Sequence, residues 1–479
     1  MAGGFAQQLH RLRTTTGSNL HQFEALFGDW IKRFHLSQQD EGAHSRDRRW
    51  NLRLLFWTFL WQVAQAGASC REAIRQAQSL CHLNERPVPP DESSPYCQAR
   101  SAIPIERLEN IHRAVVEDAE AAVGAKDLWC GHRVRVADGT TVTLPDTPLN
   151  QEAYPQQKSQ KPGCGFPLLR IMAFFSLATG MLVSWVTGPW LKSEAALLQL
   201  LWEELRTGDV LLADRGFCRW AMLAQCGIKG IHAVIRVQGA KRKDFRTGQR
   251  LSKQERLVCW GKPRTPAASL SAGQWAQLPD GLQLRLVRCQ LARAGFRTHE
   301  VTLVTTLLDS IKYSVTDLGR LYRRRWDMEL TLRHVKTTLQ MEHLSCKTPD
   351  NVERELRMHL LVHNLVRRLM FEAARRSGVP LDRVSFAGGL ALARRIGEAL
   401  LQARTKRKCR ELIEELYRVL ATDLVPDRPG RREPRAIKRR PKPFALLTKH
   451  RSVFRETPHK SHFWAARRSK ARRKNKGLN

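Results

Sequence analysis

The stretch DVLLADRGF, residues 209–217, decides the fold. Four apolar residues lead into Asp214-Arg215-Gly216, so the sequence predicts a short buried strand that ends at an acid. An ionised carboxylate loses hydration beside a buried strand, which is costly unless the carboxylate has a partner. Taken alone, Asp214 is either an ordinary turn residue or a ligand.

The residues before this strand predict three further strands and a helix. HRVRVADGTTVTL (132–144) alternates and is β-branched, and LLRIMAFFSLATG (168–180) and MLVSWVTG (181–188) follow as two strands around a Thr179-Gly180 turn. SEAALLQLLWEEL (193–205) has the spacing of an amphipathic helix. We expect Asp138 to end the first strand as Asp214 ends the fourth. This order indicates an α/β, RNase H-like core with two acids at adjacent strand ends.

The rest of the chain is arranged around this core. Short alternating segments separated by Gly and Pro predict a β-rich insertion, and helical patterns return after it. We expect five regions: 1–125, an N-terminal helical DNA-binding domain; 126–217, the first part of the core; 218–308, the insertion; 309–378, the second part of the core; and 379–479, a C-terminal helical region with a basic tail.

Two features of the N-terminal and apolar segments leave alternatives open. A helix bearing Tyr96, Gln98 and Arg100 is either a DNA-reading unit or part of a plain helical subdomain. The apolar run 173–191 resembles a membrane span, but Gly180, Gly188 and Pro189 interrupt it, and two buried strands are the better interpretation.

Charge indicates the kind of partner. Lys and Arg number 81 against 45 Asp and Glu, a formal net charge of +36. Such an excess needs an anionic partner, and a phosphodiester backbone is the commonest one, although ribosomal and membrane-surface proteins are also basic. The eleven cysteines never show C-x-x-C spacing, so we expect free thiols in a reducing compartment. With no signal-peptide pattern, a cytoplasmic, nucleoid-associated protein is expected.

One helical segment, YRRRWDMELTLRHVK (322–336), carries the chemistry. Tyr322, Arg325, Glu329 and Lys336 fall along one stripe of a 3.6-residue helix. One carboxylate between a tyrosine and two cations suits a metal-binding acid whose neighbours hold phosphates, and a solvated charged face is the alternative. Carboxylates from Asp138, Asp214 and Glu329 would form an oxygen cage for Mg²⁺ or Mn²⁺.

The spacing Y-x2-R-x3-E-x6-K resembles the signature of the insertion-sequence-4 family of DDE transposases. VADGTT and LLADRGF are similar to its regions around the first two catalytic aspartates, and residues 161–171 and 434–447 also look like family segments. The resemblance covers about residues 130 to 447.

The resemblance implies a metal-binding catalytic triad of Asp138, Asp214 and Glu329. It also implies contacts of Tyr322, Arg325 and Lys336 with phosphates of the transposon end, to which we add Arg333 on the same helix. The expected partners are double-stranded DNA, as transposon ends and target, and a second copy of the chain in a homodimer.

Cut-and-paste transposition in this family often proceeds through a DNA hairpin that needs an unpaired base. An aromatic side chain of the insertion would stack on that base, and Trp260 is the candidate, followed by Trp275. Each tryptophan is more commonly structural.

Other interpretations remain. His359 and His363 have the spacing of zinc ligands, but they lie in an apolar segment and are expected to be core residues. Cys164, between two glycines, is expected to be a turn residue. The competing functions are a catalytically idle DNA-binding regulator and an RNase H-fold nuclease that cuts without strand transfer.

Overall fold

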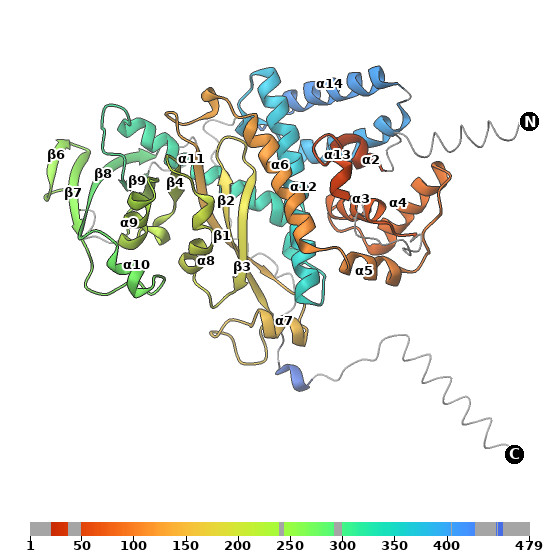
Figure 1. Cartoon of the computed structure of the whole chain (residues 1–479), viewed down its shortest axis with the longest axis horizontal. Coiled ribbons are helices and arrows are strands. Elements are labelled where there is room, and N and C mark those ends of the chain that lie inside the picture. The colour runs from red at the N-terminus through yellow and green to blue at the C-terminus, as the bar shows by residue number, and fades with distance from the viewer. Residues whose placement is uncertain are drawn as a thin grey trace, which may run out of the picture.

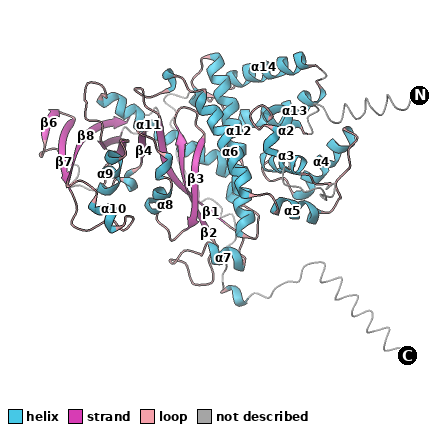
Figure 2. Ribbon diagram, in the orientation of Figure 1, coloured by secondary structure: helices cyan, strands magenta, loops and turns pink. Residues whose placement is uncertain are grey.

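The structure is a computed structural model that describes residues 21–36, 49–238, 244–291, 299–403, 405–426, 447 and 449–453; for residues 291, 299, 327, 329 and 343 it describes the backbone alone. The described part is a mixed α/β protein built around one nine-stranded sheet (Figures 1 and 2). Of the basic run 430–479, only 447 and 449–453 lie among the described residues.

The sheet has the strand order β3-β2-β1-β4-β5-β9-β8-β7-β6. Its strands are β1 Val134–Thr143, β2 Leu168–Ser176, β3 Leu182–Pro189, β4 Val210–Ala213, β5 His232–Arg236, β6 Gln249–Ser252, β7 Glu255–Gly261, β8 Gly281–Leu291 and β9 His299–Thr305. β1, β4 and β5 are parallel to one another, and the other pairings are antiparallel. The predicted strands on either side of Thr179-Gly180 are confirmed as β2 and β3.

The region predicted as a separate insertion belongs to this same sheet. Residues 218–236 supply helix α9 (Trp220–Ile228) and then β5, which pairs in parallel with β4. β9 joins β5, and β8, β7 and β6 extend the sheet outward to the left of Figure 1. The short alternating segments are therefore strands as expected, but they extend the central sheet and do not form a second one.

Helices cover both faces of the sheet and form a separate layer beside it (Figure 2). The remaining α-helices are α2 Gln22–Phe27, α3 Leu52–Ala64, α4 Cys70–Leu83, α5 Ser93–Ser101, α6 Ile105–Ala121, α7 Pro148–Ala153, α8 Glu194–Leu200, α10 Ala272–Ala276, α11 Val315–Arg333, α12 Pro349–Ser377, α13 Phe386–Gln402 and α14 Lys406–Thr422. A five-residue π-helix, His334–Thr338, continues α11.

Alternation along the strands assigns each face to different helices. Val136, Leu212 and Val234 share a buried cluster with residues of α11 and α12. Their neighbours in sequence point to the other face, where the cluster includes residues of α8 and α9. Because side chains alternate with a period of two, even-numbered positions of β1, β4 and β5 face α11.

The N-terminal and C-terminal helices share one hydrophobic core. It joins residues of α3 and α6, such as Phe56 and Val115, to residues of α12 and α14, such as Leu365 and Leu420. α12, which is buried along most of its 29 residues, runs between the sheet and the N-terminal helices (Figure 1). The first 120 residues therefore do not bury their apolar surface by themselves.

Two of the three side chains considered for DNA reading on α5 are committed to this core. Tyr96 is fully buried, and its hydroxyl donates to Gln62 at 2.9 Å. The Arg100 guanidinium lies 3.8 Å from the centre of the Phe59 ring. Of the three side chains only Gln98 is exposed, and a DNA-reading role for this helix remains a prediction.

The two candidate zinc ligands are core residues as predicted. His359 and His363 are both buried, and His363 forms a hydrogen bond with the side chain of Asn364. The Asn364 side chain also accepts from the N–H of Leu182 in β3 and donates to its carbonyl. Cys164 is buried, and all eleven cysteines are free. None of the described helices has the length and apolarity needed to cross a membrane.

Candidate active site

Two acids and one arginine lie in a row across the three parallel strands. Val136 of β1 is level with Leu212 of β4, so two residues further along, Asp138 is level with Asp214. Ala213 of β4 is level with Ile235 of β5, so Arg236 continues the row at the next position. All three are even-numbered positions, and they therefore face α11.

Asp138 lies in the middle of β1 and not at its end as expected. β1 continues to Thr143 because β2 pairs with it along this whole length, and Asp138 is opposite Ala173. On the other edge of β1, β4 ends at Ala213, so Asp138 lies where β1 loses that neighbour. Its Oδ1 accepts a hydrogen bond from the Gly139 N–H at 2.9 Å, and the side chain is half-buried.

Asp214 directly follows β4, as predicted. It is the N-cap of a short 3₁₀ turn, Arg215–Phe217, and its Oδ1 accepts a hydrogen bond from the Gly216 N–H at 2.7 Å. A Cβ atom at position 216 would lie 3.0 Å from that oxygen, so glycine allows the close approach. This turn fixes the carboxylate at the end of a fully buried strand.

Tyr322 connects α11 to the row. Its side chain is 2% exposed, more deeply buried than the sequence indicated. Burial is the largest influence on the pKa of Tyr322 and raises it. Arg325 lowers this pKa through its charge and a hydrogen bond, and the charge of Arg236 lowers it too. The charge of Asp214 raises it. The hydroxyl is therefore protonated at neutral pH and lies close to all three charged groups.

Arg325 lies one turn beyond Tyr322, is 8% exposed, and has its guanidinium carbon 5.7 Å from the centre of the Tyr322 ring. Glu329 occupies the next turn of α11 on the same side of the helix. The structure describes its backbone alone, so the position of the third predicted carboxylate remains a prediction.

The stripe on α11 does not continue regularly to Lys336. The π-helix His334–Thr338 is wider than an α-helix, so the offset of seven residues from Glu329 no longer returns to the same side. Lys336 forms an ion pair with Glu342 at 3.6 Å and keeps 23% of its side chain exposed. Arg333, the last residue of α11, is exposed.

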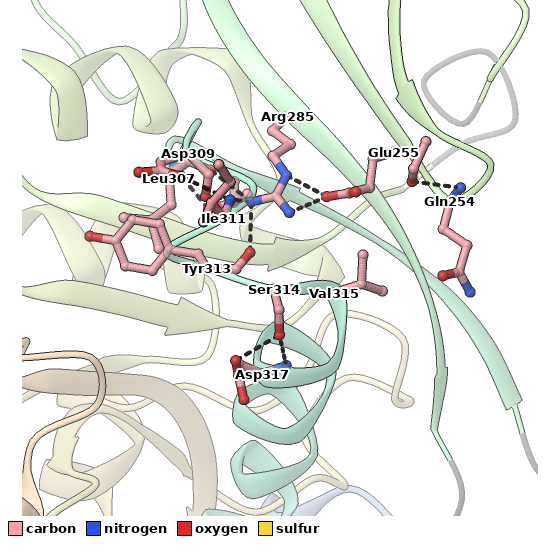
Figure 3. A network of polar contacts seen from close by, with 12 residues as sticks. Gln254, Glu255, Arg285, Leu307, Asp309, Ile311, Tyr313, Ser314, Val315 and Asp317 are labelled. Atoms are coloured by element: carbon pink, nitrogen blue, oxygen red, sulfur yellow. Dashed lines mark hydrogen bonds and ion pairs between the residues drawn. The ribbon is translucent and has the colours of Figure 1, made fainter.

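A buried arginine holds the start of α11 against the outer strands (Figure 3). Arg285 of β8 is fully buried and donates to the Glu255 carboxylate on β7. Its Nη1 also donates to the backbone carbonyls of Asp309 at 3.1 Å and Tyr313 at 2.8 Å, in the loop that leads into α11. The helix then begins at Ser314, whose Oγ accepts the Asp317 N–H. Strands β7 and β8 are thus tied to the helix that carries Tyr322.

Trp260 is half-buried on β7 and belongs to a small aromatic cluster. Its carbonyl accepts a hydrogen bond from Trp220 Nε1 at 2.8 Å, and the Trp220 and Trp275 rings are 5.7 Å apart. Trp220 begins α9, shortly after Asp214. Trp275 also lies 5.4 Å from the Lys262 ammonium. The cluster therefore lies next to the segment that follows Asp214. Both candidate tryptophans, Trp260 and Trp275, pack against this cluster.

Arg236 is the member of the row that the sequence did not suggest. It is the last residue of the segment HAVIR, and a basic residue at the end of a strand is ordinarily predicted to face solvent. Its level with Asp214 depends on the parallel register between β4 and β5, which no local pattern contains.

The donor set suits a hard divalent cation. Asp138 and Asp214 offer carboxylate oxygens, which Mg²⁺ and Mn²⁺ prefer, and both are partly accessible. Among the side chains that the structure describes, no three His, Cys, Asp or Glu gather closely enough to hold a metal, and the side chain of Glu329 is not among those described.

Comparisons with known proteins agree on one family. Residues 129–365 match the model of the "Transposase DDE domain" family. The chain is 25% identical over 399 residues to the transposase InsG for insertion sequence element IS4 of Escherichia coli K12, covering 83% of this chain and 87% of that protein. It is 28% identical over 134 residues to the putative transposase InsZ of the same organism, covering 28% of this chain and 45% of InsZ.

A solved structure of the piggyBac transposase synaptic complex with hairpin DNA also matches, with 10% identity and a TM-score of 0.40. The match covers 82% of this chain and 84% of the piggyBac chain.

Proposed function

We propose, since this chain is a DDE transposase of the insertion-sequence-4 type, that it cuts DNA at the ends of its own element and joins those ends to target DNA. The observation that carries the proposal is the row of Asp138, Asp214 and Arg236 facing the helix of Tyr322, Arg325 and Glu329. Two acids at one level of neighbouring strands, beside the half-buried Arg236 and the buried Arg325, suit the chemistry of a phosphodiester.

The strand order supports an RNase H-like core. Three antiparallel strands, β1 to β3, are followed by β4 and β5 in parallel with β1, and the acids lie on β1 and directly after β4. In open sheets of this kind, sites form at the carboxyl ends of parallel strands. The five regions expected from the sequence remain the proposed domains, with the N- and C-terminal helices sharing a core.

Asp138, Asp214 and Glu329 are the proposed ligands of Mg²⁺ or Mn²⁺. Two such ions, when bound, would activate a water or a 3′-hydroxyl and stabilise the leaving oxygen during in-line attack. The hydrogen bonds from Gly139 and Gly216 each engage one oxygen of the two aspartates and so fix their orientation. The rigid turn at Asp214 adds to this preorganisation.

The basic residues around the row are proposed to hold the DNA backbone. Arg236 and Arg325 flank the Tyr322 hydroxyl and would position the scissile phosphate through charge-assisted hydrogen bonds. Lys336 and Arg333, more exposed and further along the chain, would contact phosphates outside the cut. The oxygen of the neutral Tyr322 hydroxyl accepts the hydrogen bond from Arg325 and so holds that guanidinium in place.

The partners follow from this chemistry. We propose double-stranded transposon ends and target DNA as substrates and a homodimer that bridges two ends, in a cytoplasmic, nucleoid-associated protein. A hairpin intermediate would require an unpaired base, and Trp260, with Trp275 as the second choice, is the proposed stacking partner. Trp260 is half-buried beside α9, and its partial exposure supports this assignment.

A cleavage assay tests the proposal. A DNA fragment carrying the element's end is incubated with the wild-type protein and with Glu329→Gln, in Mg²⁺, Mn²⁺ or EDTA, and binding is measured in parallel. Metal-dependent cutting at the end that Glu329→Gln abolishes, with binding retained, supports the triad. Binding without cutting in either metal would instead identify a DNA-binding regulator. Cutting without joining of a labelled end to target DNA would identify a nuclease.

A further inference from the structure

Two thiols face each other between α4 and α5, in the helical layer away from the candidate active site. Cys70 is the first residue of α4, and its Sγ lies 3.8 Å from the Sγ of Cys97 on α5. Cys97 is exposed and Cys70 is half-buried, so solvent-borne reagents reach the pair. A disulfide would shorten this separation to about 2.05 Å.

The surroundings of Cys70 favour its thiolate. Its Sγ accepts hydrogen bonds from Gln62 Nε2 at 3.6 Å and from Arg100 Nη1 at 3.8 Å. The free N–H groups at the start of α4 add positive potential at the same atom. The hydrogen bond from Cys97 is the largest influence, and with Gln62 and Arg100 it outweighs burial and lowers the pKa of Cys70 to about 6. The same hydrogen bond raises the pKa of Cys97.

We propose that Cys70 and Cys97 are a reactive thiol pair that hydroperoxides convert into a disulfide. The Cys70 thiolate attacks the terminal peroxide oxygen and the O–O bond breaks. Cys70 sulfenic acid forms, and an alkoxide leaves, or hydroxide when the oxidant is hydrogen peroxide. The Cys97 thiol then attacks the Cys70 sulfur and displaces its oxygen, which leaves as water with the Cys97 proton. Each sulfur is oxidised by one electron and the peroxide is reduced by two.

Oxidation would reach beyond the pair through Arg100. This guanidinium donates to Cys70 from Nη1 and to Cys346 from Nη2 at 3.8 Å, and Cys346 lies in the segment that connects α11 to α12. A disulfide removes the thiolate that Arg100 faces. The oxidised pair would thus alter a contact between the N-terminal helices and the second part of the predicted core.

Alkylation rates test the first step without any assay of DNA cutting. Native protein is treated with iodoacetamide between pH 5 and 9, and peptides containing Cys70 and Cys259 are quantified by mass spectrometry. Cys259, exposed on β7, is the reference thiol. A thiol ionising near pH 6 should react about tenfold faster than an ordinary one at pH 6, after allowing for its lower intrinsic nucleophilicity. The alkylation rate of Cys70 should level off above pH 7. In Arg100→Gln the rate should level off at a higher pH.

Peroxide treatment tests the second step. We expect the peptides of Cys70 and Cys97 to become joined, and Cys97→Ser to stop at a sulfenic acid that dimedone traps on Cys70. Cys70→Ser should leave Cys97 unoxidised under the same conditions, with circular dichroism confirming that each variant is folded. Equal alkylation rates and pH profiles for Cys70 and Cys259, or a peroxide product without a Cys70–Cys97 link in the wild type, would overturn the proposal.

Discussion

Asp138 and Asp214 lie at the same level of two neighbouring parallel strands, although one is in the middle of its strand and the other follows the end of its own. β4 stops short while β1 continues beside β2, and this difference in length opens the edge of β1 at Asp138. Both aspartates are therefore at one level of the sheet, and each is partly accessible.

Replacing Asp214 by Asn should separate catalysis from folding. The Asn side-chain oxygen still accepts the Gly216 N–H as an N-cap, so the free energy of unfolding should change by less than about 1 kcal/mol. Loss of one proposed metal ligand should lower the cleavage rate by about a thousandfold, because the bound ions would stabilise negative charge in the transition state.

The matched control for this variant is Glu204→Gln, which removes one negative charge at an exposed site. Cleavage kinetics and a binding isotherm are measured for both variants. Asp214→Asn cutting DNA at close to the wild-type rate would contradict a role as metal ligand.

Tyr322→Phe should show what the buried hydroxyl does. The ring remains packed, so the loss is that of one hydrogen bond to Arg325, which costs about 0.5–1.5 kcal/mol. If Arg325 positions the scissile phosphate, cleavage should fall by about tenfold with little change in DNA affinity, since a misplaced group affects the transition state more than binding. Urea denaturation and single-turnover cleavage measure the two effects. A variant that loses affinity and keeps its cleavage rate would show that Tyr322 serves binding alone.

Arg285→Met should be among the most destabilising substitutions in the sheet. It leaves Glu255 buried without its cation and frees the carbonyls at the start of α11, which should cost about 3–5 kcal/mol. The double variant Arg285→Met/Glu255→Leu should recover part of that loss, because no unpaired buried charge remains. Equilibrium denaturation measures the free energy of unfolding in both.

The exposed pair Arg246–Asp244 provides the comparison for Arg285. Arg246→Met should leave the free energy of unfolding nearly unchanged, because an exposed ion pair is screened by solvent. If Arg285→Met were equally mild, the network in Figure 3 would not be what holds α11 against β7 and β8.

Buried histidines should make the fold sensitive to acid. Burial lowers the pKa of His359 to about 4, below its unfolded value of 6.5. The unfolded chain therefore binds this proton first, and the stability contributed by neutral His359, up to about 3 kcal/mol, is present above pH 6.5 and lost as the pH falls toward 4.

His359→Gln should flatten the dependence of the unfolding free energy on pH over this window. Urea denaturation at pH 7, 5.5 and 4 measures it for both proteins. Burial lowers the pKa values of His21 and His112 further than that of His359. The variant should therefore keep part of the pH dependence of its unfolding free energy. An unchanged slope would mean that His359 is charged in the folded state.

Local patterns predicted most of the sheet but not its register. The alternation of β1 to β3 and the apolar run of β4 are properties of short segments, and all four strands form where expected. Asp138 is expected at a strand end, yet pairing with β2 carries β1 onward to Thr143. Arg236 was missed because its level with Asp214 arises only when two distant segments pair.

The helical regions show the same division. The segment around Glu329 was identified as a helix, but the π-turn that displaces Lys336 depends on packing that periodicity does not contain. Tyr96 and Arg100 were considered for DNA reading because their helix has exposed-looking polar residues. α12, encoded some 250 residues later, contributes to the hydrophobic core that buries Tyr96.

The shared helical core also has a consequence for biosynthesis. Phe23, Phe56 and Val115 are translated long before the α12 residues that bury them. At about 5–20 residues per second, the first helices wait on the order of ten seconds or more for their partner. During that interval their apolar faces are available to chaperones and to neighbouring nascent chains, and a ribosome that stops before α12 releases a product that cannot close its helical layer.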